Sequence, residues 1–259
     1  MDQLDCQFNI SQALPAARAQ VRAARAGTTA YPQSASDAQI RLYSGALRSL
    51  ARLYTAACVR ELSLRYEAPL PPGPKIIALN HANVTDALFL PSIFPDVICF
   101  LAQANLFDLP VVGRLLALSG HLPVIRGQSG ALLEAAGRHL RRGYTIAVCP
   151  EGRLNHGGPL HRGRIGAVRL ALQSGFPIVP VGFYVADRYT RVVHAKVDGR
   201  ATYGRWQLGG ACQVEIGRPW WPGQRTPGDA HQLQPRRLTD ELMRQIETLV
   251  RQAQARAEL

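Results

Sequence analysis

KIIALNHANVTD, residues 75–86, predicts a buried strand, a turn and the start of a helix. The strand is Lys75–Leu79, a short apolar run of the kind that lies inside a sheet. His81 follows this strand, and Asp86 opens the helix. On one continuous helix their spacing would set the two side chains about 140° apart, so they can meet only across a turn. The stretch therefore predicts an α/β fold with a possible base and its carboxylate partner at one strand end.

Strands and helices alternate on both sides of this stretch. We expect strands at 62–66, 97–101, 122–126, 144–149 and 178–183, and helices at 86–93, 105–119, 129–142 and 164–174. Thr85 is the expected N-cap of the first of these helices. Residues 190–223 are strand-prone, and apolar residues at helical spacing predict a C-terminal helix. The expected fold class is α/β, with a mixed, largely parallel sheet flanked by helices.

The 259 residues fit one domain with a small extension. Residues 1–36 are expected to be a flexible N-terminal arm, and 37–259 a single domain whose motif core spans about 60–190. An N-terminal amphipathic helix should begin at Asp37, because apolar residues recur there at steps of three and four: Ile40, Tyr43, Leu47, Leu50, Tyr54 and Ala57. Its Arg41, Arg48 and Arg52 lie on another face. The favoured interpretation is that the stripe packs on the core and the arginines are solvated; the alternative is a helix in a membrane interface.

Arginine dominates the charge of the chain. The formal net charge is +12, and because Lys75 and Lys196 are the only lysines, 28 of the 30 cationic residues are Arg. Eight arginines lie in 120–170, against Glu134 and Glu151. The planar guanidinium suits phosphate, which favours an anionic membrane surface or a phosphorylated molecule as partner. Nucleic acid is not expected as a partner, because the chain lacks aromatic-basic motifs and a recognition helix.

The five cysteines are scattered and form no CxxC pair, which is typical of reduced cysteine and not of a zinc or disulfide framework. No metal site is expected. The first ten residues lack the apolar core of a secretory signal. No apolar run of the sequence reaches the ~20 residues needed to span a bilayer. We therefore expect a peripheral protein on the cytoplasmic face of the cell membrane, without a transmembrane span.

A second strand end carries a carboxylate and arginines. The predicted strand 144–149 runs directly into Pro150-Glu151-Gly152-Arg153. A glycine-rich basic loop follows, and it contains Arg162 and Arg164. Exposed backbone amides and arginines of this kind suit a phosphate group. Taken singly, this loop also fits a solvated basic surface, and His81 with Asp86 also fits a loop histidine and a helix-starting aspartate with no shared task.

Four blocks, taken in order, resemble the glycerolipid or lysophospholipid acyltransferase family, typified by lysophosphatidic acid acyltransferases. The blocks are Asn80-His81-x4-Asp86, Gly120 to Arg126, Cys149-Pro150-Glu151-Gly152-Arg153-Leu154, and Ile178-Val179-Pro180-Val181. The second block keeps only its Gly and Arg. In the third, Arg153 stands where the family usually has Thr, and Leu154 where it usually has Arg.

The resemblance implies transfer of a fatty acyl chain from a thioester, on coenzyme A or acyl carrier protein, to the hydroxyl of a lysophospholipid such as 1-acylglycerol-3-phosphate. It implies His81 as general base, held by Asp86, and no cofactor apart from the thioester co-substrate. The implied acceptor-binding residues are Asn80, Arg126, Glu151, Gly152 and Arg153, with Glu151 orienting the arginines and Arg162 or Arg164 as substitutes at the phosphate. The alternatives are another lyso-lipid or alcohol as acceptor, such as a lyso-aminolipid, and a catalytically silent module that binds anionic lipid.

Overall fold

The computed structural model describes residues 21, 31–32, 35–155, 158–197, 200–223 and 234–258. Its helices are α2 (Asp37–Cys58), α3 (Thr85–Ile93), α4 (Val112–Leu118), α5 (Ser129–Arg141), α6 (Gly166–Ser174) and α7 (Pro235–Ala257), with 3-10 helices η1 (Ala104–Asp108) and η2 (Asp187–Tyr189). Its strands are β1 (Glu61–Tyr66), β2 (Ile76–Leu79), β3 (Ile98–Gln103), β4 (Leu122–Val124), β5 (Thr145–Val148), β6 (Ile178–Tyr184), β7 (Thr190–Val197), β8 (Arg200–Gln207) and β9 (Ala211–Ile216). Most of the expected arm, 1–36, lies outside the described residues. Within it, Tyr31 donates a hydrogen bond to the carbonyl of Pro123.

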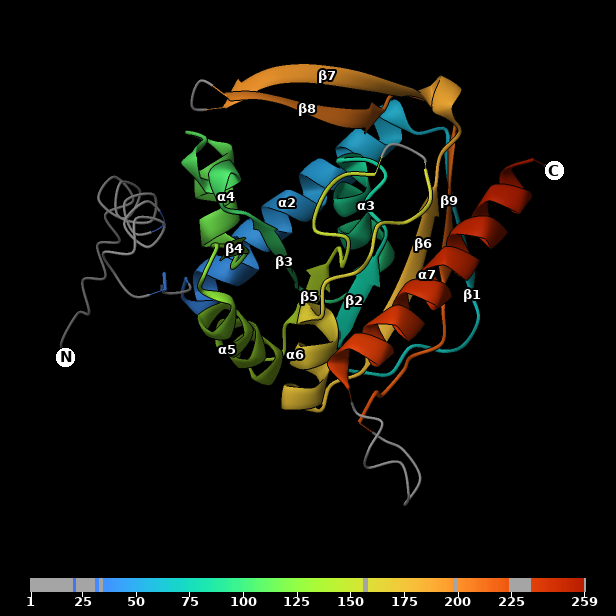
Figure 1. Cartoon of the computed structure of the whole chain (residues 1–259). Helices are drawn as coiled ribbons and strands as arrows, with labels where there is room; N and C mark the ends of the chain where they lie inside the picture. The colour runs from blue at the N-terminus through green and yellow to red at the C-terminus, as the bar shows by residue number, and fades with distance from the viewer. Residues whose placement is uncertain are drawn as a thin grey trace, which may run out of the picture.

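Seven strands form one sheet in the order β1-β9-β6-β2-β5-β3-β4. Neighbouring strands are parallel except for β6 and β9, which pair antiparallel. The remaining two strands, β7 and β8, form a separate antiparallel hairpin. In Figure 1 this hairpin crosses the top of the view, and α7 runs along the β6 and β9 side of the sheet. The prediction of a mixed, largely parallel sheet flanked by helices is confirmed.

The central strand β2 is covered on both sides, and all four of its residues are buried. Ile76 and Ala78 pack into a core that includes α5, α6 and α7. Ile77 and Leu79 point the other way, into a core that includes α3. This alternation follows from the two-residue period of a strand, and a strand buried on both faces is necessarily apolar throughout. The end of β2 is thereby held rigidly between two helical layers.

The predicted amphipathic helix is α2, which begins with a capping box between Ser36 and Gln39. Its inner face is buried at Ile40, which belongs to the predicted apolar stripe, and at Ala51, which does not. Two expectations for this helix are wrong. Leu50 is 55% exposed and lies outside the packed stripe. Arg48 is not simply solvated, because its guanidinium donates to the backbone carbonyls of Pro95 and Asp96, in the connection between α3 and β3.

Several predicted boundaries also differ from the structure. Thr85 does not cap α3: the N-cap position is Val84, which makes no side-chain capping bond. The stretch expected to be helical around Pro110 divides into η1 and α4, because proline removes a backbone donor there. The strand expected at 122–126 ends at Val124. Gly175 ends α6 with φ of +75°, the left-handed conformation expected of a glycine C-cap.

Candidate active site

The two predicted strand ends meet because β2 and β5 are parallel neighbours, with Ala78 opposite Val148. The carboxylate of Glu151, just after β5, accepts a 3.1 Å hydrogen bond from the backbone amide of His81. Asn155 closes the connection from the other side. The backbone amide of Asn155 donates to the carbonyl of His81 at 2.7 Å, and the side-chain amide of Asn155 donates to the Glu151 carboxylate at 2.9 Å. The first and third sequence blocks therefore form one hydrogen-bonded unit.

Asp86 is fully buried and holds the turn that contains His81. One carboxylate oxygen accepts from the backbone amide of Asn83 at 2.7 Å, and the other accepts from the Asn83 side chain at 3.2 Å. Free amides at the start of a helix are natural partners for such a carboxylate. The carboxylate is thus bound to its own turn.

The predicted hydrogen bond between Asp86 and the His81 ring is not made. Nδ1 of His81 is buried and has no hydrogen-bond partner within the described part of the chain. Asn83 is instead the donor to both oxygens of Asp86. Burial lowers the pKa of His81 below its usual 6.5, and the nearby Glu151 carboxylate opposes this in part. Burial thus favours the neutral ring, which is the form that can accept a proton.

Burial has the opposite effect on the carboxylic acid beside it. It raises the pKa of Asp86 to about 7, while the hydrogen bonds from Asn83 and the charge of Arg205 favour the ionised form. The thiol of Cys149 lies close to both carboxylates of the site. Its pKa is raised first by burial and then by the negative charges of Asp86 and Glu151. The two carboxylates therefore act on one small volume at the ends of β2 and β5.

The side chain of Asn80 is hydrogen-bonded to the backbone of β6. Its side-chain amide donates to the carbonyl of Phe183 at 3.0 Å and accepts from the amide of Phe183 at 2.8 Å. Asn80 follows the last residue of β2, so its side chain continues the hydrogen bonding between β2 and β6 beyond the end of the strand. The buried side chain therefore holds the residue before His81 against β6, and a role for Asn80 in acceptor binding stays a prediction.

Glu151 does not orient arginines, and this expectation is wrong. Its carboxylate is buried and accepts from the backbone amides of His81 and His161 and from the Asn155 side chain. Across the described ranges, no salt bridge joins Glu151 to an arginine. Its charge is used to hold two loops together, because a buried carboxylate needs several donors.

Two of the predicted arginines flank Gly152, which has φ of +68°. A Cβ at this position would lie 2.5 Å from Nε of Arg164, so glycine allows that side chain to pass. On the other side, Nη2 of Arg153 lies 3.2 Å from Nδ1 of His161. Arg153 and Arg164 are both exposed. The exposed Arg153 and Arg164 therefore form a cationic surface on the loop that starts at Glu151. Glu151 itself is hydrogen-bonded to the backbone of His81.

The other two predicted arginines lie farther away. The charge of Arg162 acts on Asp240 of α7, which places it toward the C-terminal helix. Arg126 is exposed two residues beyond β4, at the same edge of the sheet as His81. With β5 and β3 between β4 and β2, this edge position is about 14 Å from β2 at the usual strand spacing. A role for Arg126 in acceptor binding stays a prediction.

Sequence reasoning missed Asn83, Asn155 and Arg205. Asn83 stands three residues before Asp86, and this spacing is a local signal for a capping turn that was open to recognition. Asn155 stands in a loop with no periodicity, and Arg205 is more than a hundred residues from Asp86. Their contacts come from tertiary structure alone.

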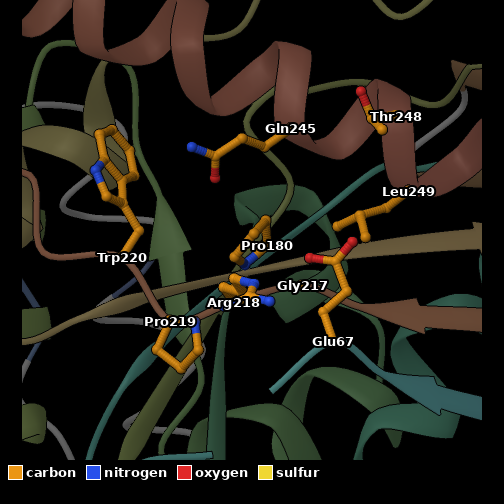
Figure 2. Close-up of a pocket in the computed structure, with 9 residues that line it drawn as sticks. All are labelled: Glu67, Pro180, Gly217, Arg218, Pro219, Trp220, Gln245, Thr248 and Leu249. Atoms are coloured by element: carbon orange, nitrogen blue, oxygen red, sulfur yellow. The ribbon is translucent and has the colours of Figure 1, made fainter.

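A hollow of the described structure lies apart from His81. It has a volume of about 340 Å³ and opens between α7 and the loop after β9 (Figure 2). Arg218, Trp220 and Gln245 are among its lining residues, and none of the predicted site residues is. The candidate active site is therefore the hydrogen-bonded unit at the ends of β2 and β5.

Comparison with known proteins identifies the family of the region that contains both strand ends. Residues 62–184, which contain both strand ends, match the model of a family described as Acyltransferase. The chain carries an acyltransferase domain. The domain holds His81, Asp86, Glu151 and the arginines around Gly152. The family resemblance drawn from the four sequence blocks is confirmed.

Individual relatives of the acyltransferase domain are distant. A 1-acyl-sn-glycerol-3-phosphate acyltransferase of Borreliella burgdorferi is 30% identical over 118 residues, 44% of this chain and 47% of the relative. The alpha form of 1-acyl-sn-glycerol-3-phosphate acyltransferase from Mus musculus is 28% identical over 163 residues, 61% of this chain and 54% of the relative. This chain therefore spans about half the length of these relatives.

The fold has a solved counterpart. The crystal structure of the 1-acyl-sn-glycerophosphate acyltransferase PlsC from Thermotoga maritima superposes with a TM-score of 0.54 at 18% identity. The superposition covers 80% of this chain and 79% of that one. At this identity the likeness concerns the fold, and it agrees with the α/β sheet described above. Within the described residues, the acyltransferase domain and its flanking segments have no helix long and apolar enough to cross a bilayer.

Proposed function

We propose that this chain transfers a fatty acyl group from a thioester to the free hydroxyl of 1-acylglycerol-3-phosphate, with His81 as general base. The observation that carries the proposal is the Glu151 carboxylate, which joins the His81 turn to the cationic loop around Gly152. A base and a phosphate site have to be held at a set separation, because the acceptor carries its hydroxyl and its phosphate on one glycerol. The names of the relatives favour the same acceptor.

The reaction needs little beyond a base and orientation. In the proposed step the acceptor oxygen attacks the thioester carbonyl carbon while Nε2 of His81 takes the hydroxyl proton. Nδ1 is the buried nitrogen of the ring, so Nε2 is the one that meets the substrate. The tetrahedral intermediate then expels the thiolate as the carbon–sulfur bond breaks, and the imidazolium returns the proton to sulfur. The thioester is carried by coenzyme A or by acyl carrier protein.

Lipid mass spectrometry tests the proposal directly. The full chain is incubated with a mixture of lysophospholipids and a lyso-aminolipid, once with acyl-CoA and once with acyl carrier protein thioester. We expect 1-acylglycerol-3-phosphate to be the lipid that chiefly gains the mass of one acyl chain, with release of an equal amount of thiol. Acylation of the lyso-aminolipid alone would move the function to another acceptor. Lipid binding without thiol release would identify a silent lipid-binding module.

The acceptor phosphate is proposed to bind at Arg153 and Arg164. We expect Arg153→Ala to raise KM for 1-acylglycerol-3-phosphate about 10- to 100-fold, the effect of losing one charge-assisted hydrogen bond of about 1.5–3 kcal/mol. KM for the thioester should change by less than about twofold, since the donor does not use this contact. Initial-rate kinetics with each substrate varied in turn measure both constants.

A matched variant is Arg251→Ala, because Arg251 is also exposed but lies on α7 and pairs with Glu247. It should leave both constants unchanged. Equal increases of the two constants in Arg153→Ala would instead show that Arg153 supports the loop and not the acceptor.

The outer face of α2 is the proposed membrane-docking surface. Leu42, Leu50 and Leu53 lie on one side of the helix and are 70%, 55% and 67% exposed. Arg41 and Arg52 on the same helix are also exposed. Exposed leucines next to arginines suit the boundary between acyl chains and anionic headgroups. Both lipids of the proposed reaction would reach the site from such a surface.

We expect the double substitution Leu50→Gln with Leu53→Gln to weaken binding to phosphatidylglycerol-containing vesicles at least about tenfold, since burying each leucine is worth about 1.5–3 kcal/mol. Sedimentation with sucrose-loaded vesicles measures the change. Leu64→Gln, on the edge strand β1 where Leu64 is 37% exposed, is the matched control. Unchanged vesicle binding by the double variant would rule out α2 as the docking surface.

A further inference from the structure

A β-hairpin outside the main sheet lies against the turn that carries His81. The amide of Val84, inside that turn, donates a 2.9 Å hydrogen bond to the carbonyl of Arg205 on β8. Strand β8 also packs against α3, the helix that the turn opens, and Figure 1 shows the hairpin above this helix. The four sequence blocks do not include the hairpin, so the chemistry assigned to them leaves this contact unexplained.

Gly204 is the point of closest approach between the hairpin and the turn. A Cβ built on Gly204 would lie 2.8 Å from Cγ2 of Val84 and 3.0 Å from Nε1 of Trp206. Real Cβ atoms essentially never approach another atom as closely as 2.8 Å, so a larger residue would force Val84 or the strand to shift. Gly204 is buried, and its missing side chain is what allows the neighbouring hydrogen bond from Val84.

Arg205 anchors the hairpin beside the turn. Its side chain is 8% exposed, its Nε donates to Oγ1 of Thr190 at 3.0 Å, and its guanidinium pairs with Asp187. At the base of the hairpin the carbonyl of Gln207 accepts a hydrogen bond from the hydroxyl of Tyr54 on α2. The hairpin is thus tied to the segment before β7 and to α2, which makes it a firm support.

Arg205 is also the cation whose charge acts on Asp86. The other titratable groups that sense this carboxylate are the thiols of Cys149 and Cys212, and burial keeps both of them neutral by raising their pKa. A buried carboxylate with few countercharges depends strongly on the one that is near.

We infer that Gly204 and Arg205 are positioning residues for the proposed acyl transfer: β8 holds Val84 in place, and through it the turn that sets His81 and Asp86. The inference rests on the proposed function of His81. The hairpin does not touch the reacting atoms in this arrangement. It acts through the turn, so its loss should change turnover before it changes substrate binding.

A double-substitution cycle tests the contact between Gly204 and Val84. We expect Gly204→Ala to lower kcat about 10- to 100-fold, the effect of a small displacement of a catalytic group, with KM for both substrates within about twofold. Val84→Ala alone should have a smaller effect. The double variant should recover most of the lost turnover, because removing Cγ2 of Val84 makes room for the new Cβ.

Gly130→Ala is the matched control, since a Cβ there meets nothing within 4 Å. It should leave kcat unchanged and should not lower the thermal midpoint, since alanine favours a helix over glycine. A Gly204→Ala variant with normal kcat would overturn the inference, and so would a double variant that is no faster than Gly204→Ala. Neither result would touch the proposed function, which the lipid assay and the His81→Ala variant test separately.

The pH profile tests Arg205 separately. Removing the cation in Arg205→Met should raise the pKa of Asp86, so the acid limb of kcat/KM should move to higher pH, and Arg205→Lys should restore it. A merely structural role would lower the thermal midpoint of both variants without moving the limb. An unshifted limb in Arg205→Met would therefore remove Arg205 from the inference.

Discussion

Replacing His81 by alanine should lower kcat for acyl transfer about 10²- to 10⁴-fold, the usual contribution of a general base. The fold should persist, because the contacts of His81 with Glu151 and Asn155 are made by its backbone amide and carbonyl. The rate of thiol release at saturating substrates measures the loss, and thermal unfolding checks the fold. Turnover near that of the parent protein would refute His81 as the base.

The parent protein should also show an acid limb in kcat/KM. Burial raises the pKa of Asp86 to about 7 and lowers the pKa of the His81 ring below 6.5. Because an ionised Asp86 holds the turn that carries His81, kcat/KM should fall through a limb centred near pH 7 before the ring is protonated. A limb that begins only below pH 6.5 would instead belong to His81 and would show that ionisation of Asp86 is not required.

Glu151→Gln should have the second largest effect, with kcat/KM lower by about 10²-fold and an unfolding free energy lower by about 1–3 kcal/mol. The amide of glutamine keeps one acceptor oxygen but turns its NH2 group toward a donor, and His81, His161 and Asn155 all donate to this carboxylate. One buried donor is then left unpaired, and the two loops separate. Steady-state kinetics and chemical denaturation measure the two quantities.

Glu134→Gln makes the matched comparison, because Glu134 lies exposed on α5 and only approaches Arg138 at 4.0 Å. Neither activity nor stability should change in that variant. If Glu151→Gln lost stability but kept kcat/KM, the two loops would be joined for folding alone, and the proposed link between base and phosphate site would be wrong.

The fold was largely predictable because its strands are short apolar runs followed by helices with clear periods. Ile76–Leu79 is buried on both faces, and a run of this kind has few other stable places in a globular protein. The antiparallel pairing of β6 with β9 was not predictable, because a pattern of side chains does not encode the direction of a strand. Boundaries near Pro110 and Thr85 were set by backbone donors and by tertiary contacts, which override local preference.

The location of the candidate site was predictable from the sequence, but the hydrogen-bond partners of its side chains were not. Parallel strands bring their carboxyl ends to one edge, so His81 and Glu151 were expected together and do meet. The partners of each side chain were not evident: Asn83 and not the imidazole donates to Asp86, and two backbone amides and the Asn155 side chain, not arginines, donate to Glu151. Such choices depend on distances of a few tenths of an ångström, which sequence spacing does not contain.

The bonds that hold residue 81 in place involve its peptide groups and not its ring. These backbone hydrogen bonds can therefore persist when the side chain at position 81 is replaced. The His81→Ala variant should hold the thioester and the lysolipid acceptor together unreacted for hours, long enough for a crystal structure of the complex. Thiol or amine side chains introduced at the same point would start from a ready-made scaffold, which makes this position a favourable one for giving the protein new chemistry.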